Sequence, residues 1–154
     1  MGPDADSLPE DRVLALVREV MTRHIPFNRV LGIELVEIAK GRVVLAIPFR
    51  PELVGDVQRP ALHGGVLSAL IDTAGGAAVW TCIAEEDRVS TVDLRVDYLR
   101  PARLETLHAC AEVLRVGNRV GVVTVRAYHP STPAETMAEG KGVYSVKRAG
   151  ERDR

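Results

Sequence analysis

The pattern of apolar and polar residues predicts an N-terminal helix followed by a hairpin. Across residues 9–23, apolar side chains recur every three or four positions with charged residues opposite. This spacing predicts an amphipathic surface helix, which we expect to stop near Pro26. Residues 33–38 and 43–49 are mostly apolar and flank Lys40-Gly41. They predict two paired strands whose turn uses the glycine. A loop with Pro51, Gly55 and Pro60 is expected to lead from them to His63.

The middle of the chain has a different pattern. From Val66 to Ile83 the only charged side chain is Asp72, and the only other ionisable group is Cys82. The length resembles that of a membrane span, but an internal aspartate, a glycine pair and strand-like flanks argue against one. The segment instead predicts a buried central helix.

The second half of the chain predicts further strands. They cover residues 89–99, 104–116, 119–129 and 136–146, separated by proline or by Gly117-Asn118. In the first of these, Val92, Leu94, Val96 and Tyr98 alternate with polar residues such as Thr91, so one face is expected to be apolar. Five or six strands and one very apolar helix predict an α+β fold, an antiparallel sheet wrapped on that helix.

Length and composition favour one globular domain. The 154 residues suffice for a single core, which we place at about 27–147, with polar, mobile ends at 1–8 and 148–154. Acidic and basic residues are interspersed and the net charge is -1, so no nucleic-acid partner is expected. Cys82 and Cys110 lie in apolar runs, as reduced thiols do, and the acidic N-terminus is unlike a signal peptide. These features predict a cytoplasmic protein without a membrane partner.

Asp72 is the residue that most needs an explanation. An isolated charge in an apolar segment costs several kcal/mol unless partners serve it. It is either a structural aspartate satisfied in the core or a catalytic base or nucleophile in a dry cleft. Its helical neighbours at three and four residues are all small, namely Ser68, Ala69, Gly75 and Gly76. Small neighbours leave the carboxylate open, but close helix packing requires the same residues.

Other candidate chemistry is weaker. The four histidines, His24, His63, His108 and His129, are scattered with no ligand spacing, so no metal site is predicted. Ser68 does not lie in a nucleophile elbow, and no order of serine, histidine and aspartate suggests a triad.

Three stretches of the sequence resemble a known family. They are LGIELVEIAKGRVVLAIPF at 31–49, HGGVLSALIDTAGGAAVW at 63–80 and STVDLRVDYLRPA at 90–102. Together they resemble the hotdog-fold acyl-CoA thioesterases, most closely the PaaI-like branch named for phenylacetate degradation. The resemblance implies a hotdog fold, homodimers that assemble into homotetramers, and hydrolysis of an acyl-CoA thioester with no cofactor.

The resemblance also implies roles for individual residues. Asp72 takes the place of the acid that activates water or attacks the carbonyl, and Gly64 that of the backbone N–H donor to the thioester oxygen. Thr91, or Ser90 in a shifted register, takes that of the hydroxyl that holds the water. Many relatives carry an amide six residues before the histidine, where this chain has Val57. Either the adjacent Gln58 substitutes for it or the amide is missing.

Helix geometry adds a constraint on this site. Gly64 and Gly65 suit a helix start that approaches substrate closely, with His63 capping or orienting it. In one continuous helix Asp72 lies about 12 Å along the axis from Gly64, too far for both to reach one carbonyl. Two antiparallel copies of the helix would bring each Asp72 beside the partner's Gly64, which predicts a composite site in a dimer.

The remaining candidates concern the coenzyme and rival functions. The phosphates of coenzyme A are expected to meet arginines at strand ends, for which Arg88, Arg100 and Arg119 are candidates. A hotdog hydratase or dehydratase would use His63 and Asp72 for proton transfer. A non-catalytic acyl-CoA-binding module would use the same pocket without hydrolysis.

Overall fold

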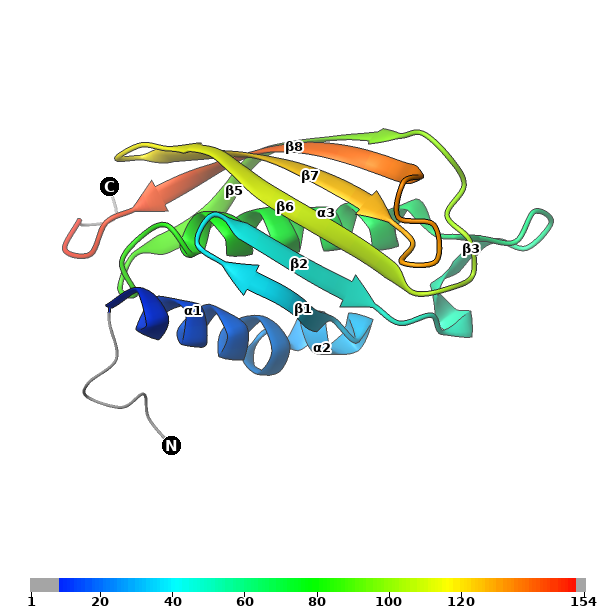
Figure 1. The fold of residues 1–154 in the computed structure, drawn as a ribbon, viewed down its shortest axis with the longest axis horizontal. Helices are drawn as coiled ribbons and strands as arrows, with labels where there is room; N and C mark the ends of the chain where they lie inside the picture. The colour runs from blue at the N-terminus through cyan, green and yellow to red at the C-terminus, as the bar shows by residue number, and fades with distance from the viewer. Residues whose placement is uncertain (1–8, 152–154) are drawn as a thin grey trace.

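A six-stranded antiparallel sheet curves around one long helix in the computed structural model, which describes residues 9–151 (Figure 1). The sheet order is β1-β2-β6-β7-β8-β5. Its strands are β1 (Glu34–Ala39), β2 (Arg42–Ile47), β5 (Arg88–Tyr98), β6 (Leu107–Val116), β7 (Val120–Tyr128) and β8 (Thr136–Lys147). The helices are α1 (Pro9–Glu19), α2 (Pro26–Leu31) and α3 (Gly64–Trp80). The predicted α+β fold is confirmed.

The central helix α3 is the core of the molecule, as its apolar sequence predicts. It packs against β2, β5, β6, β7 and β8, and Leu70 and Ile71 are fully buried. Burying a side chain of this size stabilises the fold by about 1.5–3 kcal/mol. The helix begins after His63 and ends at Thr81, whose hydroxyl donates back to the Ala78 carbonyl at 2.6 Å.

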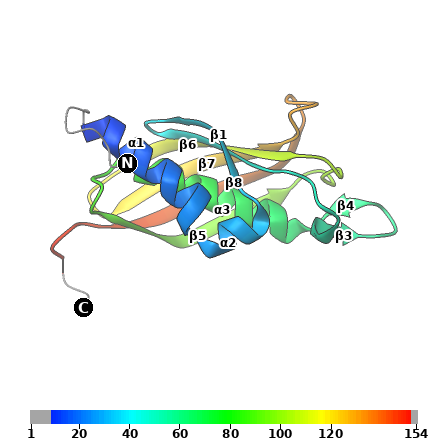
Figure 2. The same ribbon diagram turned by 90° about the horizontal axis from the view of Figure 1, so that it is seen from below.

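The N-terminal helical segment is longer than predicted. After α1 the chain makes one π-helical turn, Val20–His24, and α2 then begins at Pro26. The first helix therefore stops near Pro26 as expected, because Ile25 has an extended conformation. The short helix α2 was not predicted. It can begin at Pro26 because proline at the first position of a helix loses no hydrogen bond and has a suitable φ. The helical segment ends at Gly32, whose φ of 70° is left-handed. Figure 2 shows α1 and α2 lying beside α3.

The predicted hairpin and loop have different outcomes. The β1–β2 hairpin is confirmed, and its turn residue Gly41 has a φ of 76°. The following segment, predicted as a loop, instead contains a 3-10 turn, Pro51–Leu53, and a small hairpin of β3 (Val54–Asp56) and β4 (Ala61–Leu62). Its two strands are too short for an alternating pattern to show in the sequence. The hairpin projects at one end of the molecule (Figure 2).

Strand β5 forms one edge of the sheet and contains a bulge between Thr91 and Asp93. The bulge puts Thr91 on the same face as Leu94, toward α3, although their sequence positions differ in parity. The predicted apolar face of this strand is consequently only partly buried: Leu94 packs on the core, whereas Val92 is 65% exposed.

Part of the C-terminal end that the sequence predicts to be mobile is held against the fold. Residues 1–8 and 152–154 lie outside the described part. Arg148 and Ala149, which the sequence assigns to the C-terminal polar end, both bond to the buried carboxylate of Asp87.

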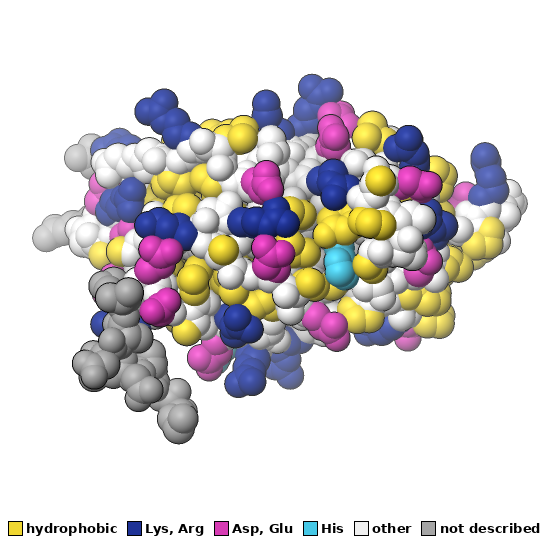
Figure 3. Space-filling model, viewed as in Figure 1, with side chains coloured by type: hydrophobic (Ala, Val, Ile, Leu, Met, Phe, Trp, Pro, Cys, Tyr) yellow, Lys and Arg dark blue, Asp and Glu magenta, His cyan; other side chains and the backbone are white. Residues whose placement is uncertain are grey.

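The outer face of the sheet carries charges of both signs among apolar patches (Figure 3).

Candidate functional site

Asp72 lies on the side of α3 that faces β5 and β8, and two hydroxyl groups donate hydrogen bonds to its carboxylate. Thr91 Oγ1 on β5 donates to Asp72 Oδ1 at 2.9 Å. The hydroxyl of Tyr144 on β8 lies 3.2 Å from the same Oδ1 and 2.9 Å from the Asp72 carbonyl oxygen. Within residues 9–151 no protein donor meets Oδ2. One carboxylate oxygen is therefore held and the other is available for chemistry.

Asp72 opens onto a cleft of about 460 Å³, so it is only partly buried. The expectation of a buried carboxylate is corrected by this exposure. The cleft has an apolar wall of Met21, Ile25 and Trp80 and a polar wall from the start of β5 that includes Arg88, Ser90 and Thr91. The structure thus brings four predicted site residues together: Asp72, Thr91, Ser90 and Arg88.

His63, Gly64 and Gly65 lie at the start of α3 and differ in their hydrogen bonds. The His63 ring caps the helix, because its Nδ1 accepts the Gly65 N–H at 2.8 Å. This bond puts the proton of a neutral His63 on Nε2 and uses the Gly65 donor. A Cβ atom at Gly65 would lie 2.9 Å from the same Nδ1, so the cap requires a glycine here. Within the described residues, the N–H of Gly64 meets no acceptor.

A second hollow, of about 290 Å³, lies beside Gly64. Tyr98 and Arg100 also line it, and the Tyr98 hydroxyl donates to the Gly64 carbonyl at 3.3 Å. This hollow and the Asp72 cleft share no lining residue. Because α3 is unbroken from Gly64 to Trp80, the separation of about 12 Å along its axis applies. One chain therefore presents two half-sites, one with the carboxylate and one with the N–H donor.

Two predicted residues lie away from both half-sites. Gln58 is exposed on the β3–β4 hairpin, where its backbone N–H donates to Asp56 Oδ1 at 2.9 Å. Arg119 is exposed in the turn between β6 and β7 and lines neither hollow. In this chain neither side chain is a neighbour of Asp72.

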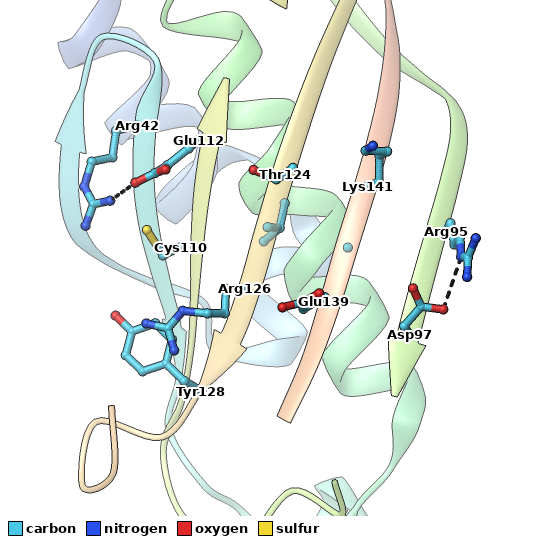
Figure 4. A pocket seen from close by; sticks show the side chains of 12 residues that line it. Arg42, Arg95, Asp97, Cys110, Glu112, Thr124, Arg126, Tyr128, Glu139 and Lys141 are labelled. Atoms are coloured by element: carbon cyan, nitrogen blue, oxygen red, sulfur yellow. Dashed lines mark hydrogen bonds and ion pairs between the residues drawn. The ribbon is translucent and has the colours of Figure 1, made fainter. Parts of the chain in front are cut away.

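A wider hollow than the Asp72 cleft lies elsewhere, on the outer face of the sheet, and measures about 650 Å³ (Figure 4). Four of its charged side chains form ion pairs, Arg42 with Glu112 and Arg95 with Asp97, and Arg126, Glu139 and Lys141 also line it. None of the predicted site residues lines it. The smaller cleft is the stronger candidate, because it contains a carboxylate with one free oxygen beside an apolar wall.

Sequence reasoning did not find Tyr144, Met21 or Ile25. Tyr144 is fully buried from solvent, and burial, followed by the negative charge of Asp72, raises its pKa. A signal was present in the glycines of α3 and of β8, which together make room for a large ring. Met21 lies in the π-helical turn, a feature frequent at functional sites but without a sequence signature.

Two further features of the described residues bear on the class of site. No helix within 9–151 is long and apolar enough to cross a membrane. Nor do three or more histidine, cysteine, aspartate or glutamate side chains of that region gather as they would around a metal ion.

The curved sheet around α3 and the matches to known proteins define the class: the chain belongs to the thioesterase superfamily, whose family model matches residues 60–134. It is similar to the medium/long-chain acyl-CoA thioesterase YigI of Escherichia coli, with 38% identity over 135 residues, 79% of this chain and 87% of that protein. The predicted family is confirmed at the level of the superfamily. The phenylacetate branch stays a prediction.

Solved structures agree with this assignment. A protein from Shewanella oneidensis related to the thioesterase superfamily has a TM-score of 0.80 and 32% identity, covering 91% of this chain and 99% of that one. A thioesterase family protein from Silicibacter pomeroyi has a TM-score of 0.80 and 29% identity, covering 88% of this chain and 98% of that one.

Proposed function

We propose that the protein hydrolyses acyl-CoA thioesters at a site completed by a second copy of the chain. The observation that carries this proposal is Asp72, which lines a partly apolar cleft and whose Oδ1 is fixed by hydroxyl groups, whereas Oδ2 has no donor in the described part of the chain. The similarity to YigI supports the acyl-CoA substrate class.

The proposed chemistry uses the two half-sites together. Asp72 Oδ2 either removes a proton from a water molecule that attacks the thioester carbonyl or attacks that carbonyl itself. The carbonyl oxygen becomes an oxyanion, which the N–H of Gly64 and the positive end of α3 stabilise. The oxyanion then re-forms the carbonyl, the carbon–sulfur bond breaks, and the thiolate of coenzyme A leaves and takes up a proton. On the water route the product is the free acid. On the direct route the acyl group is left on Asp72 as an anhydride, which a water molecule hydrolyses to the free acid and the Asp72 carboxylate.

The cleft also indicates where the substrate lies. Its apolar wall of Met21, Ile25 and Trp80 suits an acyl chain, and Gly76 lines the cleft without adding a side chain. Two of these residues, Met21 and Ile25, come from the N-terminal helical segment, which would therefore form part of the acyl pocket. Arg88 at the cleft and Arg100 beside Gly64 are proposed to meet the phosphates of coenzyme A.

The composite arrangement follows from the separation of the two groups. A base contributes about 10²–10⁴-fold to rate and one oxyanion donor about 10²–10³-fold, so a site lacking either is a poor enzyme. A two-fold axis that places two α3 helices antiparallel forms two complete sites. We propose a homodimer on this basis, and a homotetramer of two such dimers by resemblance to the family.

The experiment is a thiol-release assay on a panel of aliphatic and aromatic acyl-CoAs. Asp72→Asn keeps the shape of the side chain but removes its basicity, and we expect kcat to fall by about 10³ or more with the fold retained. Asp11→Asn, an exposed carboxylate on α1, is the matched control and should keep full turnover. An Asp72→Asn protein with near wild-type turnover would contradict the proposal.

The same panel separates the rival functions. A hydratase would change enoyl-CoA absorbance without releasing thiol, and a binding module would retain acyl-CoA without either change. His63 argues against the hydratase, because its Nδ1 is engaged in capping α3.

A further inference from the structure

We infer that Tyr144 is a positioning residue for the reaction: its hydroxyl, with that of Thr91, fixes Asp72 Oδ1 so that Oδ2 is the reacting oxygen. The inference rests on the proposed function of Asp72. No motif in the sequence points to Tyr144, which lies 72 residues beyond Asp72 and is brought to it by β8.

The contact geometry is the first support. The Tyr144 hydroxyl lies 2.9 Å from the Asp72 carbonyl oxygen and 3.2 Å from Oδ1. One phenol proton is thus shared between the backbone and the side chain of the same residue. Because the backbone oxygen belongs to a buried helix, the shared bond ties the carboxylate to a rigid frame.

The second support is that the fold makes room for this ring at two glycines. A Cβ atom at Gly142 would lie 2.5 Å from Tyr144 Cε2, and one at Gly75 would collide with the hydroxyl itself. At Gly76 a Cβ would lie 3.4 Å from Cε1, an ordinary van der Waals distance. The space that the small residues after Asp72 leave open is therefore partly filled by the ring of Tyr144. Because these residues are small, the Tyr144 hydroxyl can reach the carboxylate.

The third support is that this donor is permanent. Burial and the charge of Asp72 raise the pKa of Tyr144, so the phenol keeps its proton around neutral pH. A protonated phenol beside an ionised carboxylate can only donate to it, so Tyr144 is a constant donor to Asp72.

The two donors of Asp72 also come from a rigid part of the fold. Gln58, the candidate for the water-positioning amide, is exposed on the β3–β4 hairpin and does not contact Asp72 in its own chain. Thr91 and Tyr144 come from β5 and β8, which are adjacent in the sheet and are firmly paired. Two donors on a rigid pair of strands hold a carboxylate better than one donor on a projecting hairpin.

The test is Tyr144→Phe, which keeps the ring and removes the hydroxyl. We expect kcat to fall by about 10- to 100-fold, the range of a lost hydrogen bond to a charged group, with KM changed by less than about threefold. The acidic limb of the kcat–pH profile should move to higher pH, because the carboxylate loses a donor that favours its charged form. Tyr128→Phe, on the outer face of the sheet, is the matched control and should change neither quantity.

The outcomes separate this inference from the proposed function. If Asp72→Asn is inactive while Tyr144→Phe keeps kcat within about twofold and an unmoved acidic limb, only the inference is overturned. A loss of rate without movement of that limb would also overturn it, since helix packing alone would explain the loss. If Asp72→Asn keeps its turnover, the proposed function itself fails.

A second measurement keeps the inference testable if Tyr144→Phe does not fold. Site-specific incorporation of 3-fluorotyrosine at position 144 leaves Tyr98 and Tyr128 unchanged. It makes the Tyr144 hydroxyl a stronger donor without removing it. We expect the acidic limb to move to lower pH, and an unchanged limb would overturn the inference.

Discussion

At the scale of single residues, Asp72 and Asp87 show how the hydrogen-bond partners of a carboxylate determine its role. Asp72 has hydroxyl donors on one oxygen and a cleft at the other. Asp87 is buried, and both its oxygens are occupied, by Arg148 at 2.7 Å and by the backbone N–H groups of Ala149 and Ala84 at 3.0 and 3.2 Å. The first arrangement leaves an oxygen for chemistry, whereas the second stabilises the chain end.

Asp87 predicts a pH dependence of stability. Burial tends to raise the pKa of Asp87, but the bonds from Ala149, Arg148 and Ala84 outweigh it and lower that pKa below 3.8. Because the folded-state pKa is the lower one, the stability that Asp87 contributes is present above the unfolded value and is lost as the pH falls through the folded value. Asp87→Asn should lower the free energy of unfolding at pH 7 by about 3 kcal/mol.

Urea unfolding at pH 7 and below pH 4 measures both effects. The loss caused by Asp87→Asn should shrink in acid, where wild-type Asp87 is itself protonated. An equal loss at both pH values would show that the charge of Asp87 is not what stabilises the fold.

At the scale of elements, the contact between α3 and β8 depends on which of two adjacent glycines faces the sheet. A Cβ atom at Gly75 would collide with Tyr144 and lie 3.0 Å from Val123 Cγ2, whereas one at Gly76 meets Tyr144 at 3.4 Å. We expect Gly75→Ala to destabilise the protein by about 1–3 kcal/mol despite the better helix propensity of alanine. Gly76→Ala, the matched control, should be neutral or gain up to about 1 kcal/mol.

Thermal unfolding of the two variants decides the matter. Gly75→Ala should also lower kcat, because the hydroxyl of Tyr144 is displaced from Asp72. Equal stabilities for Gly75→Ala and Gly76→Ala would mean that Tyr144 moves aside without cost and that the glycines do not fix its position.

The elements also show where sequence reasoning reached its limit. The apolar run around Asp72 and the glycine at the β1–β2 turn follow local rules, so α3 and that hairpin were predictable. Thr91 was recognised through resemblance, but strict alternation would turn it away from Leu94, and only the bulge in β5 reconciles them. Tyr144 meets Asp72 through the pairing of β8 with β5 and β7, a long-range register that local patterns do not contain.

At the scale of the whole molecule, one chain holds the two half-sites apart. The Asp72 carboxylate lies in one, and the Gly64 N–H at the start of α3 lies in the other. The edge strand β5 contacts both half-sites, through Thr91 at Asp72 and Tyr98 at Gly64, and it exposes Val92 and Tyr98, at 65% and 54%. An exposed edge strand with apolar side chains invites pairing with another chain. The proposed dimer would cover these side chains and complete both sites in one step.

Mixed dimers test this arrangement directly. Asp72→Asn removes the base, and Gly64→Pro removes the N–H donor. Proline is well tolerated at the first position of a helix, and His63 has the extended conformation that proline requires before it. Each variant alone should be nearly inactive. When the two are unfolded and refolded together at equal amounts, half of the dimers pair one chain of each kind.

In every mixed dimer, Asp72 of the Gly64→Pro chain would face Gly64 of the Asp72→Asn chain, giving one intact site and one doubly altered site. Thiol release should therefore recover to about one quarter of the wild-type rate, because half of the dimers carry half of their sites. A site built within one chain would recover nothing, since each chain would keep its own defect. Recovery that appears only on co-refolding, and not on mixing the folded variants, would locate the reaction at the seam between two copies of α3.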